Sequence, residues 1–211
     1  MSSGPESPRP VPDADRGRRP RPTRVEIENA RGGTVPDVVA PGLTVVFCGI
    51  NPSLYSAAVG HHFARPGNRF WPVLHRSGFT PRQLAAEEDA RLIEFGLGIT
   101  NLVPRATARA DELSDQELRD GAVALGRRLR SVPPRWVAIV GVSAYRIAFG
   151  ARKAGIGPQA GSLGDAAVWV LPNPSGLNAH YSLAALVAAF RDFRQYVEAK
   201  AGGHKSHQDE R

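Results

Sequence analysis

Cysteine is nearly absent from this sequence, and long apolar runs are absent altogether. The 211 residues include one cysteine, Cys48, so no disulfide can form within the chain, which favours a reducing compartment. One cysteine is also too few for a zinc finger or a cysteine-ligated iron–sulfur cluster. No run approaches the roughly 18 apolar residues of a membrane span, and the N-terminus lacks the apolar core of an export signal. We therefore expect a cytoplasmic protein with no membrane partner.

Several catalytic signatures are missing as well. The chain has no Gly-x-Ser-x-Gly elbow, no P-loop lysine motif and no dinucleotide-binding glycine pattern after a strand. His61 and His62 are adjacent, but no carboxylate or third histidine stands at a spacing typical of metal ligands. We expect neither a metal nor another cofactor.

The composition suits one folded domain between two polar tails. The 42% hydrophobic content is enough for a proper core, whereas residues 1–37 combine many prolines and arginines with almost no apolar periodicity. We predict a disordered basic, proline-rich tail over 1–37, a folded domain over 38–200 and a second disordered tail over 201–211. The net charge of +7 fits a polyanionic partner. The basic tail could hold phosphates loosely, or could simply be solvated.

Short apolar runs alternate with helical patterns along the domain. The runs cover residues 43–48, 98–103, 136–141 and 167–171, and each is typical of a buried strand. Spaced apolar residues predict helices near 68–77, 81–95, 114–131, 143–153 and 182–200. Nothing between the main strands indicates a hairpin, so the strands should be parallel. The predicted fold is α/β with three layers: a central parallel four-stranded sheet with helices on both faces.

Two loops at the carboxyl ends of these strands carry the same tripeptide. Asn51-Pro52-Ser53 follows the first strand, and Asn173-Pro174-Ser175 follows the last. Each proline pushes the preceding asparagine out of the helical region, which should leave its amide free. Ligands bind beyond the carboxyl ends of strands in open α/β sheets. Two rigid carboxamides facing one crevice would suit a neutral amide or an oriented water, although each one alone also fits an ordinary turn.

Five motifs, which follow one another along the chain in a fixed order, resemble those of one enzyme family. They are Gly49-Ile50-Asn51-Pro52, Gly60-His61-His62-Phe63, residues 66–71 (PGNRFW), residues 98–103 (GITNLV) and residues 171–177 (LPNPSGL). Spanning about Pro41 to Glu198, they are similar to the mismatch-specific uracil/thymine DNA glycosylases of the uracil-DNA glycosylase superfamily. The resemblance implies that superfamily's fold and the hydrolysis of the N-glycosidic bond of uracil, or a related base, opposite guanine. The base is first flipped out of the duplex.

The resemblance also assigns roles around a base pocket. Asn51 matches the catalytic residue that positions the attacking water, and Phe63 matches the aromatic that stacks on the flipped base. Ser56 matches the position beside the pyrimidine C5 edge, where a hydroxyl should crowd the 5-methyl group of thymine. The pocket set implied in this way is Ile50, Asn51, Ser56, His62, Phe63 and Asn173.

The second Asn-Pro-Ser tripeptide opens a segment similar to the wedge loop of the family. The matching residues are Ser175, Gly176, Leu177 and Asn178. In the family this loop fills the gap left by the flipped base, and Leu177 matches the inserted side chain, a recurring use of apolar residues at DNA steps.

The expected protein is a monofunctional DNA N-glycosylase of base-excision repair. We expect a monomer that acts on double-stranded DNA with a G·U or G·T mismatch, prefers G·U, and associates with the nucleoid if the source is bacterial. Because an amide cannot act as a general base at neutral pH, turnover should be slow. Two alternatives stay open: a catalytically weak module that binds mismatched or damaged DNA, and a superfamily glycosylase for another base such as ethenocytosine or hypoxanthine.

Overall fold

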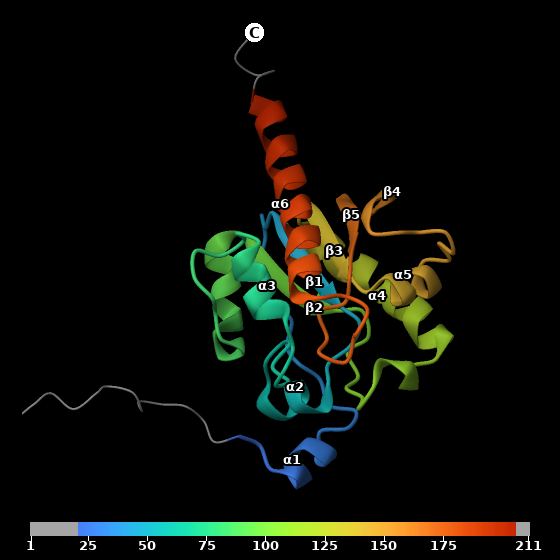
Figure 1. Ribbon diagram of the computed structural model, residues 1–211. Coiled ribbons are helices and arrows are strands. Elements are labelled where there is room, and N and C mark those ends of the chain that lie inside the picture. Colours follow the sequence, from blue (N-terminus) through green and yellow to red (C-terminus); the bar gives the residue numbers. More distant parts are fainter. Residues whose placement is uncertain (1–20, 206–211) are drawn as a thin grey trace, which may run out of the picture.

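The computed structural model describes residues 21–205 of the chain. A central sheet is covered by helices on both faces (Figure 1). The first half of the chain contains α1 (Arg24–Asn29), β1 (Val45–Gly49), α2 (Leu54–Val59), α3 (Phe70–Arg76), the 3-10 helix η1 (Ala86–Phe95) and β2 (Leu97–Asn101). The second half contains the 3-10 helix η2 (Ala110–Glu112), α4 (Asp115–Ser131), β3 (Trp136–Val140), α5 (Val142–Ala148), β4 (Gly157–Leu163), β5 (Ala166–Leu171) and α6 (Leu183–Lys205).

The sheet has five strands in the order β2-β1-β3-β5-β4. β2, β1, β3 and β5 are parallel, which confirms the predicted α/β fold with helices on both faces. The prediction of four strands missed β4, which pairs antiparallel with β5 at the edge of the sheet. Most of β4 faces solvent. It therefore has no apolar run, and its glycines are typical of a loop in the sequence.

Alternate residues of β1 face two separate hydrophobic layers. Val45 and Phe47 pack with side chains of α3, η1 and α6, whereas Val46 and Cys48 pack with side chains of α4 and α5. All four side chains are at most 1% exposed, and burying an apolar side chain of this size contributes roughly 1.5–3 kcal/mol. Cys48 is a small core residue with no exposed surface, and this burial raises the pKa of its thiol to about 12.

Residues 21–37 are ordered, which corrects part of the predicted N-terminal tail. Thr23 begins α1 with a capping box. In the segment that follows, Gly32 donates a backbone hydrogen bond to Ala106, and Val38 pairs antiparallel with Ile99 of the edge strand β2. This order comes from backbone pairing with distant residues, so local composition could not reveal it. The rest of the predicted tail, residues 1–20, lies outside the described residues.

The C-terminal boundary also moves. Helix α6 continues through Lys205, so residues 201–205 are helical and do not belong to a disordered tail, whereas residues 206–211 lie outside the described part of the chain. No helix within residues 21–205 is long and apolar enough to cross a membrane.

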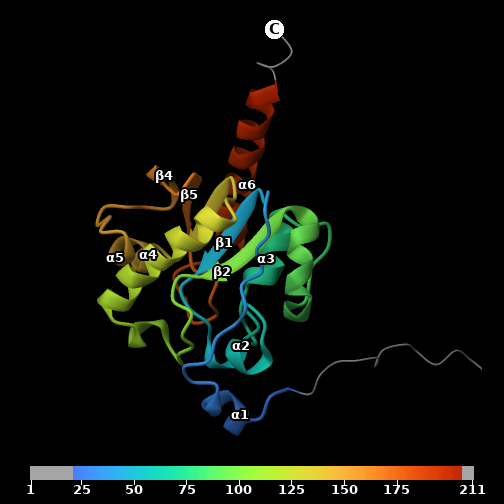
Figure 2. The same ribbon diagram turned by 180° about the vertical axis from the view of Figure 1, so that it is seen from behind.

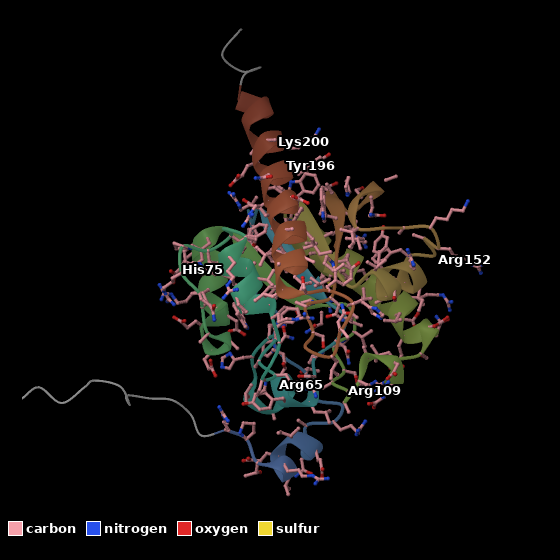
Figure 3. The ribbon with its side chains drawn as sticks, viewed as in Figure 1. Arg65, His75, Arg109, Arg152, Tyr196 and Lys200 are labelled. Atoms are coloured by element: carbon pink, nitrogen blue, oxygen red, sulfur yellow. The ribbon has the colours of Figure 1, made fainter. Side chains whose placement is uncertain are left out.

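The loops that leave the parallel strands gather at one end of the molecule. Helix α2 follows β1 directly, and α2 and α1 lie together at this end in both views (Figures 1 and 2). Arg65 and Arg109 also lie there, whereas Lys200 lies toward the opposite end on α6 (Figure 3). Any site built from these loops therefore opens next to arginine side chains.

Candidate active site

Strand pairing brings two asparagines to one crevice. Gly49 ends β1 and pairs with Asn101, which ends β2, so Asn51 leaves the sheet beside Asn101. A Cβ atom on Gly49 would lie 2.6 Å from Asn101 Oδ1 and 3.1 Å from Phe63 Cζ. Glycine at this position therefore makes room for a polar and an aromatic side chain at the end of the sheet.

A cavity lies at this end, with about 670 Å³ of empty space including its open mouth. Eight of the ten predicted site residues line it: Ile50, Asn51, Ser56, His62, Phe63, Asn173, Ser175 and Leu177. The other two, Gly176 and Asn178, line adjoining hollows that share Leu177 with the cavity. The fold thus collects the two Asn-Pro-Ser loops around one space.

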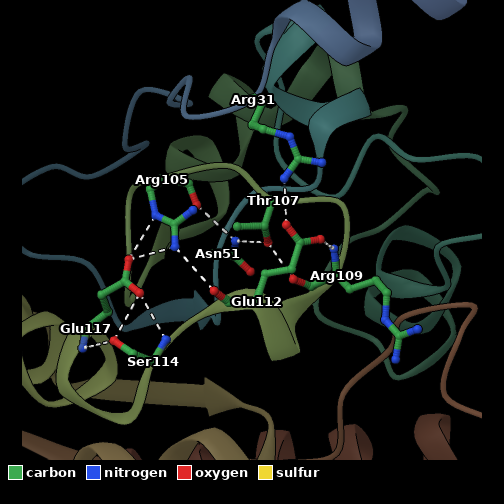
Figure 4. Close-up of polar contacts among 8 residues, drawn as sticks. All are labelled: Arg31, Asn51, Arg105, Thr107, Arg109, Glu112, Ser114 and Glu117. Carbon is green, nitrogen blue, oxygen red and sulfur yellow. Dashed lines mark hydrogen bonds and ion pairs between the residues drawn. The ribbon is translucent and has the colours of Figure 1, made fainter.

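The carboxamide of Asn51 is held from one side. Its Nδ2 donates to the carbonyl of Arg105 (2.9 Å) and to Thr107 Oγ1 (2.7 Å), and the Thr107 hydroxyl donates to the carbonyl of Arg109 (2.7 Å; Figure 4). A carbonyl oxygen can only accept, so the amide nitrogen must face it and Oδ1 must face away. The amide of Asn51 was predicted to be free. Its Nδ2 group is instead used in hydrogen bonds within the protein, and Oδ1 is the atom that remains for a ligand.

Ion pairs hold the loop that supplies these acceptors. Arg105 pairs with Glu117 at the start of α4 (2.7 Å), and Glu112 accepts from the backbone N–H of Arg109 (2.9 Å) and pairs with Arg31 (2.6 Å; Figure 4). The loop is thereby tied to α4 on one side and to the segment after α1 on the other. The orientation of Asn51 consequently depends on contacts more than 50 residues away in sequence.

Asn173 presents the opposite half of its amide. Its Oδ1 accepts from the backbone N–H of Ser175 (2.9 Å), which closes a tight turn and leaves Nδ2 available. Asn51 therefore offers an acceptor to the cavity and Asn173 offers donors. A carbonyl oxygen of a ligand would suit Asn173, and an O–H or N–H group would suit Asn51.

Phe63 is held in an unusual backbone conformation. Its φ of 51° is the one positive φ of a non-glycine residue in the described part of the chain, and such a conformation costs about 1–2 kcal/mol. One face of its ring stacks on Phe70, with centroids 4.2 Å apart and planes 14° apart. Because Phe63 also lines the cavity, it can stack on a second planar group there.

His62 is buried and neutral. Burial lowers the pKa of His62, which is 2% exposed. Its Nε2 lies 2.9 Å from the carbonyl of Pro36, so Nε2 carries the hydrogen, and Nδ1 accepts from Asn101 Nδ2 at 3.3 Å. His62 therefore fixes the carboxamide of Asn101 in the cavity wall, and a neutral ring with both nitrogens engaged has no proton to give to a substrate.

Ser56 is also engaged. Its oxygen accepts from the backbone N–H of Ala64 (3.1 Å) and from the Ser53 hydroxyl (3.1 Å), while Ser53 Oγ caps α2 by accepting from the N–H of Ser56. The Ser56 side chain is 3% exposed. Its oxygen is fixed in the cavity wall and cannot rotate away without breaking these bonds.

We call residues 174–181, which follow Asn173, the wedge loop. Leu177 stands out from it with 63% of its surface exposed. The side chain of Asn178 is used inside the loop, since it donates to the carbonyl of Asn173 (2.9 Å) and accepts from the N–H of His180 (3.2 Å). The loop thus exposes one apolar side chain, and hydrogen bonds within the loop hold the backbone next to it.

A family comparison covers the part of the chain that builds the sheet and the cavity loops. The model of the uracil-DNA glycosylase superfamily matches residues 36–198, which includes every strand and both Asn-Pro-Ser loops.

The chain belongs to the uracil-DNA glycosylase superfamily.

A solved structure shares the fold of this superfamily member. It is the solution structure of a protein from Methanosarcina acetivorans, provisionally described as a uracil DNA glycosylase, with a TM-score of 0.52 and 22% identity. The match covers 77% of this chain and 98% of that chain. At this identity the likeness shows the fold alone. The family match makes the protein a member of a class of DNA glycosylases, which act on DNA.

The prediction from the sequence did not include several residues that line the cavity of this superfamily member, among them Asn101, Thr107 and Val35. The sequence does indicate Asn101, because it stands at the end of an apolar strand, just as Asn51 and Asn173 follow the ends of apolar strands. Thr107 had none, since its contact with Asn51 joins distant loops. Val35, 6% exposed and lining the cavity, lies in the segment predicted as disordered.

Proposed function

We propose that the protein is a base-excision repair glycosylase that flips uracil out of a G·U mismatch, hydrolyses its N-glycosidic bond and leaves an abasic site. The observation that carries the proposal is the orientation of the Asn51 carboxamide. Both hydrogens of its amide are engaged, and Oδ1 is left for the cavity. An oriented acceptor beside a planar aromatic surface suits an attacking water beside a flipped base.

In this mechanism Asn51 Oδ1 accepts a hydrogen bond from the water and directs its oxygen at C1′ of the flipped nucleotide. The C1′–N1 bond breaks, its electron pair leaves with uracil, and the water oxygen bonds to C1′. The proton of the water passes to solvent, because an amide oxygen is too weak a base to take it at neutral pH. Turnover is therefore slow and depends on the stability of the departing base anion.

Charge on the departing base is stabilised by donors in the wall. The Nδ2 group of Asn173 is available, because the Oδ1 of the same amide is the atom used in its turn. A fixed donor of this kind is worth about 10²–10³-fold in rate when it faces the charge that develops. Stacking on the open face of Phe63 adds roughly 1–3 kcal/mol of binding for the flipped base.

Preference for uracil over thymine follows from Ser56. Its oxygen is held by Ala64 and Ser53, so it cannot move away from a methyl group on the C5 edge. A contact of this kind discriminates by about 1–3 kcal/mol. The substrate is thus mismatched double-stranded DNA, G·U before G·T, bound by a monomer that needs no cofactor.

The test is a single-turnover assay with the parent protein on a panel of duplexes containing G·U, G·T, ethenocytosine or hypoxanthine. We expect alkali-labile abasic sites from G·U first and from G·T more slowly. Cleavage of another lesion faster than G·U would assign a different base. Tight binding to all duplexes without any abasic site would identify a DNA-damage binding module and refute the proposal.

A further inference from the structure

Arg69 lies just before α3 and lines no part of the cavity, yet it contacts the wedge loop throughout. Its Nε donates to the carbonyl of Pro174 (3.3 Å), Nη1 to that of Tyr181 (2.5 Å), and Nη2 to those of Ser175 (2.7 Å) and Asn178 (2.8 Å). Four donor contacts from one guanidinium therefore reach the first, second, fifth and last residues of the loop.

The backbone around Arg69 also contacts the wedge loop. The N–H of Arg69 donates to the carbonyl of Pro174 (3.1 Å). Two residues earlier, the carbonyl oxygen of Gly67 lies so close to Gly176 that a Cβ atom on Gly176 would be 2.5 Å from it. The wedge loop is thus packed directly on the loop before α3, and a side chain at residue 176 would lift it.

Arg69 accounts for much of the shape of the wedge loop. The carbonyls that it binds flank Leu177 on both sides, while Leu177 itself is 63% exposed and has little packing to hold it. A planar guanidinium can bind several acceptors in fixed directions, whereas a lysine ammonium has three donors on a flexible stem. The planar, forked arrangement of N–H donors in arginine therefore suits the contacts with these carbonyls, and a lysine would not reproduce it.

We infer that Arg69 is a positioning residue that holds the wedge loop in the shape in which Leu177 fills the gap left by the flipped base. It acts through backbone carbonyls of the protein and not through contact with the reacting atoms. The inference rests on the function proposed above, and it adds a residue to which neither the family match nor the sequence motifs gave a role.

The test measures base flipping apart from bond cleavage. A duplex carries uncleavable 2′-fluoro-deoxyuridine opposite guanine, with 2-aminopurine as the neighbouring base, so that flipping raises the fluorescence. We expect Arg69→Gln to lose most of this rise and to slow single-turnover cleavage of G·U by about 10- to 100-fold, the scale of a misplaced functional group. Arg69→Lys should behave like Arg69→Gln, because it keeps the charge but not the fork.

A double-mutant cycle separates this role from general damage. If Arg69 acts through Leu177, then Arg69→Gln combined with Leu177→Ala should be no more than about twofold slower than Leu177→Ala alone, because coupled residues are not additive. The matched control is Arg194→Gln. Arg194 is also half-buried and donates to a backbone carbonyl, that of Ser77 (2.9 Å), but it lies outside the cavity lining. This control should flip and cleave like the parent.

Three results would overturn the inference while leaving the proposed function intact: normal flipping by Arg69→Gln, full activity of Arg69→Lys, or effects of Arg69→Gln and Leu177→Ala that multiply. If the parent protein neither flips nor releases uracil, the proposed function fails and the inference fails with it.

Discussion

Replacing Thr107 by valine removes a hydroxyl next to Asn51 while keeping the size and branching of the side chain. The change breaks the 2.7 Å bond from Asn51 Nδ2 and the 2.7 Å bond to the carbonyl of Arg109. The Asn51 amide is then held by the carbonyl of Arg105 alone. A net loss of about 0.5–1.5 kcal/mol for one such bond corresponds to a fall of roughly 2- to 12-fold in the rate of base release.

The assay is single-turnover cleavage of a G·U duplex at saturating protein, with duplex affinity measured separately. Thr107→Val should slow cleavage by this factor and leave affinity unchanged, because Thr107 acts on the water site and not on DNA. Thr107→Ser keeps the hydroxyl and should restore the rate to within about twofold, since the hydrogen bond carries the effect. If Thr107→Val cleaves at the parent rate, the orientation of Asn51 does not depend on this chain of hydrogen bonds and the reasoning is wrong.

Two further predictions concern the cavity wall. Ser56→Ala should raise the rate on G·T relative to G·U, and it should also lower the free energy of unfolding in urea by about 1–3 kcal/mol, because the N–H of Ala64 loses its acceptor; unchanged stability would show that this bond has no weight. Burial lowers the pKa of His62 from 6.5, although Asp89 and Asp37 nearby raise it. As the pH falls below 6.5, the unfolded chain binds a proton that the folded chain does not, so stability falls. His62→Gln should flatten this part of the profile, and equal slopes in both proteins would contradict the neutral histidine.

Local patterns were enough to predict the fold and to single out two asparagines of the candidate site, whereas its other predicted residues were implied by the family resemblance. The four parallel strands are apolar runs that end in turn residues, and Asn51 and Asn173 stand at the ends of two of them. A strand that is buried on both faces is apolar at every position, which is why the apolar run of β1 was clear in the sequence. The edge strand β4 is largely exposed and carries no such signal.

Other parts of the candidate site depend on contacts between distant segments. Asn101 enters the cavity wall because β2 pairs with β1 in a register that sets it beside Gly49. Thr107 accepts a hydrogen bond from the side chain of Asn51, which lies 56 residues away, and Arg69 donates to backbone carbonyls more than 100 residues away. A backbone acceptor is the same in every residue type. The sequence therefore contains no local mark of these contacts, and the same holds for the segment around Val35.

The most direct test of the account is Asn51→Ala in single-turnover cleavage of a G·U duplex, with affinity measured on the uncleavable 2′-fluoro-deoxyuridine duplex. The account predicts that the variant binds and flips like the parent but releases uracil at least about 100-fold more slowly, because the water loses the acceptor that orients it. Release of uracil by Asn51→Ala at the parent rate would contradict it.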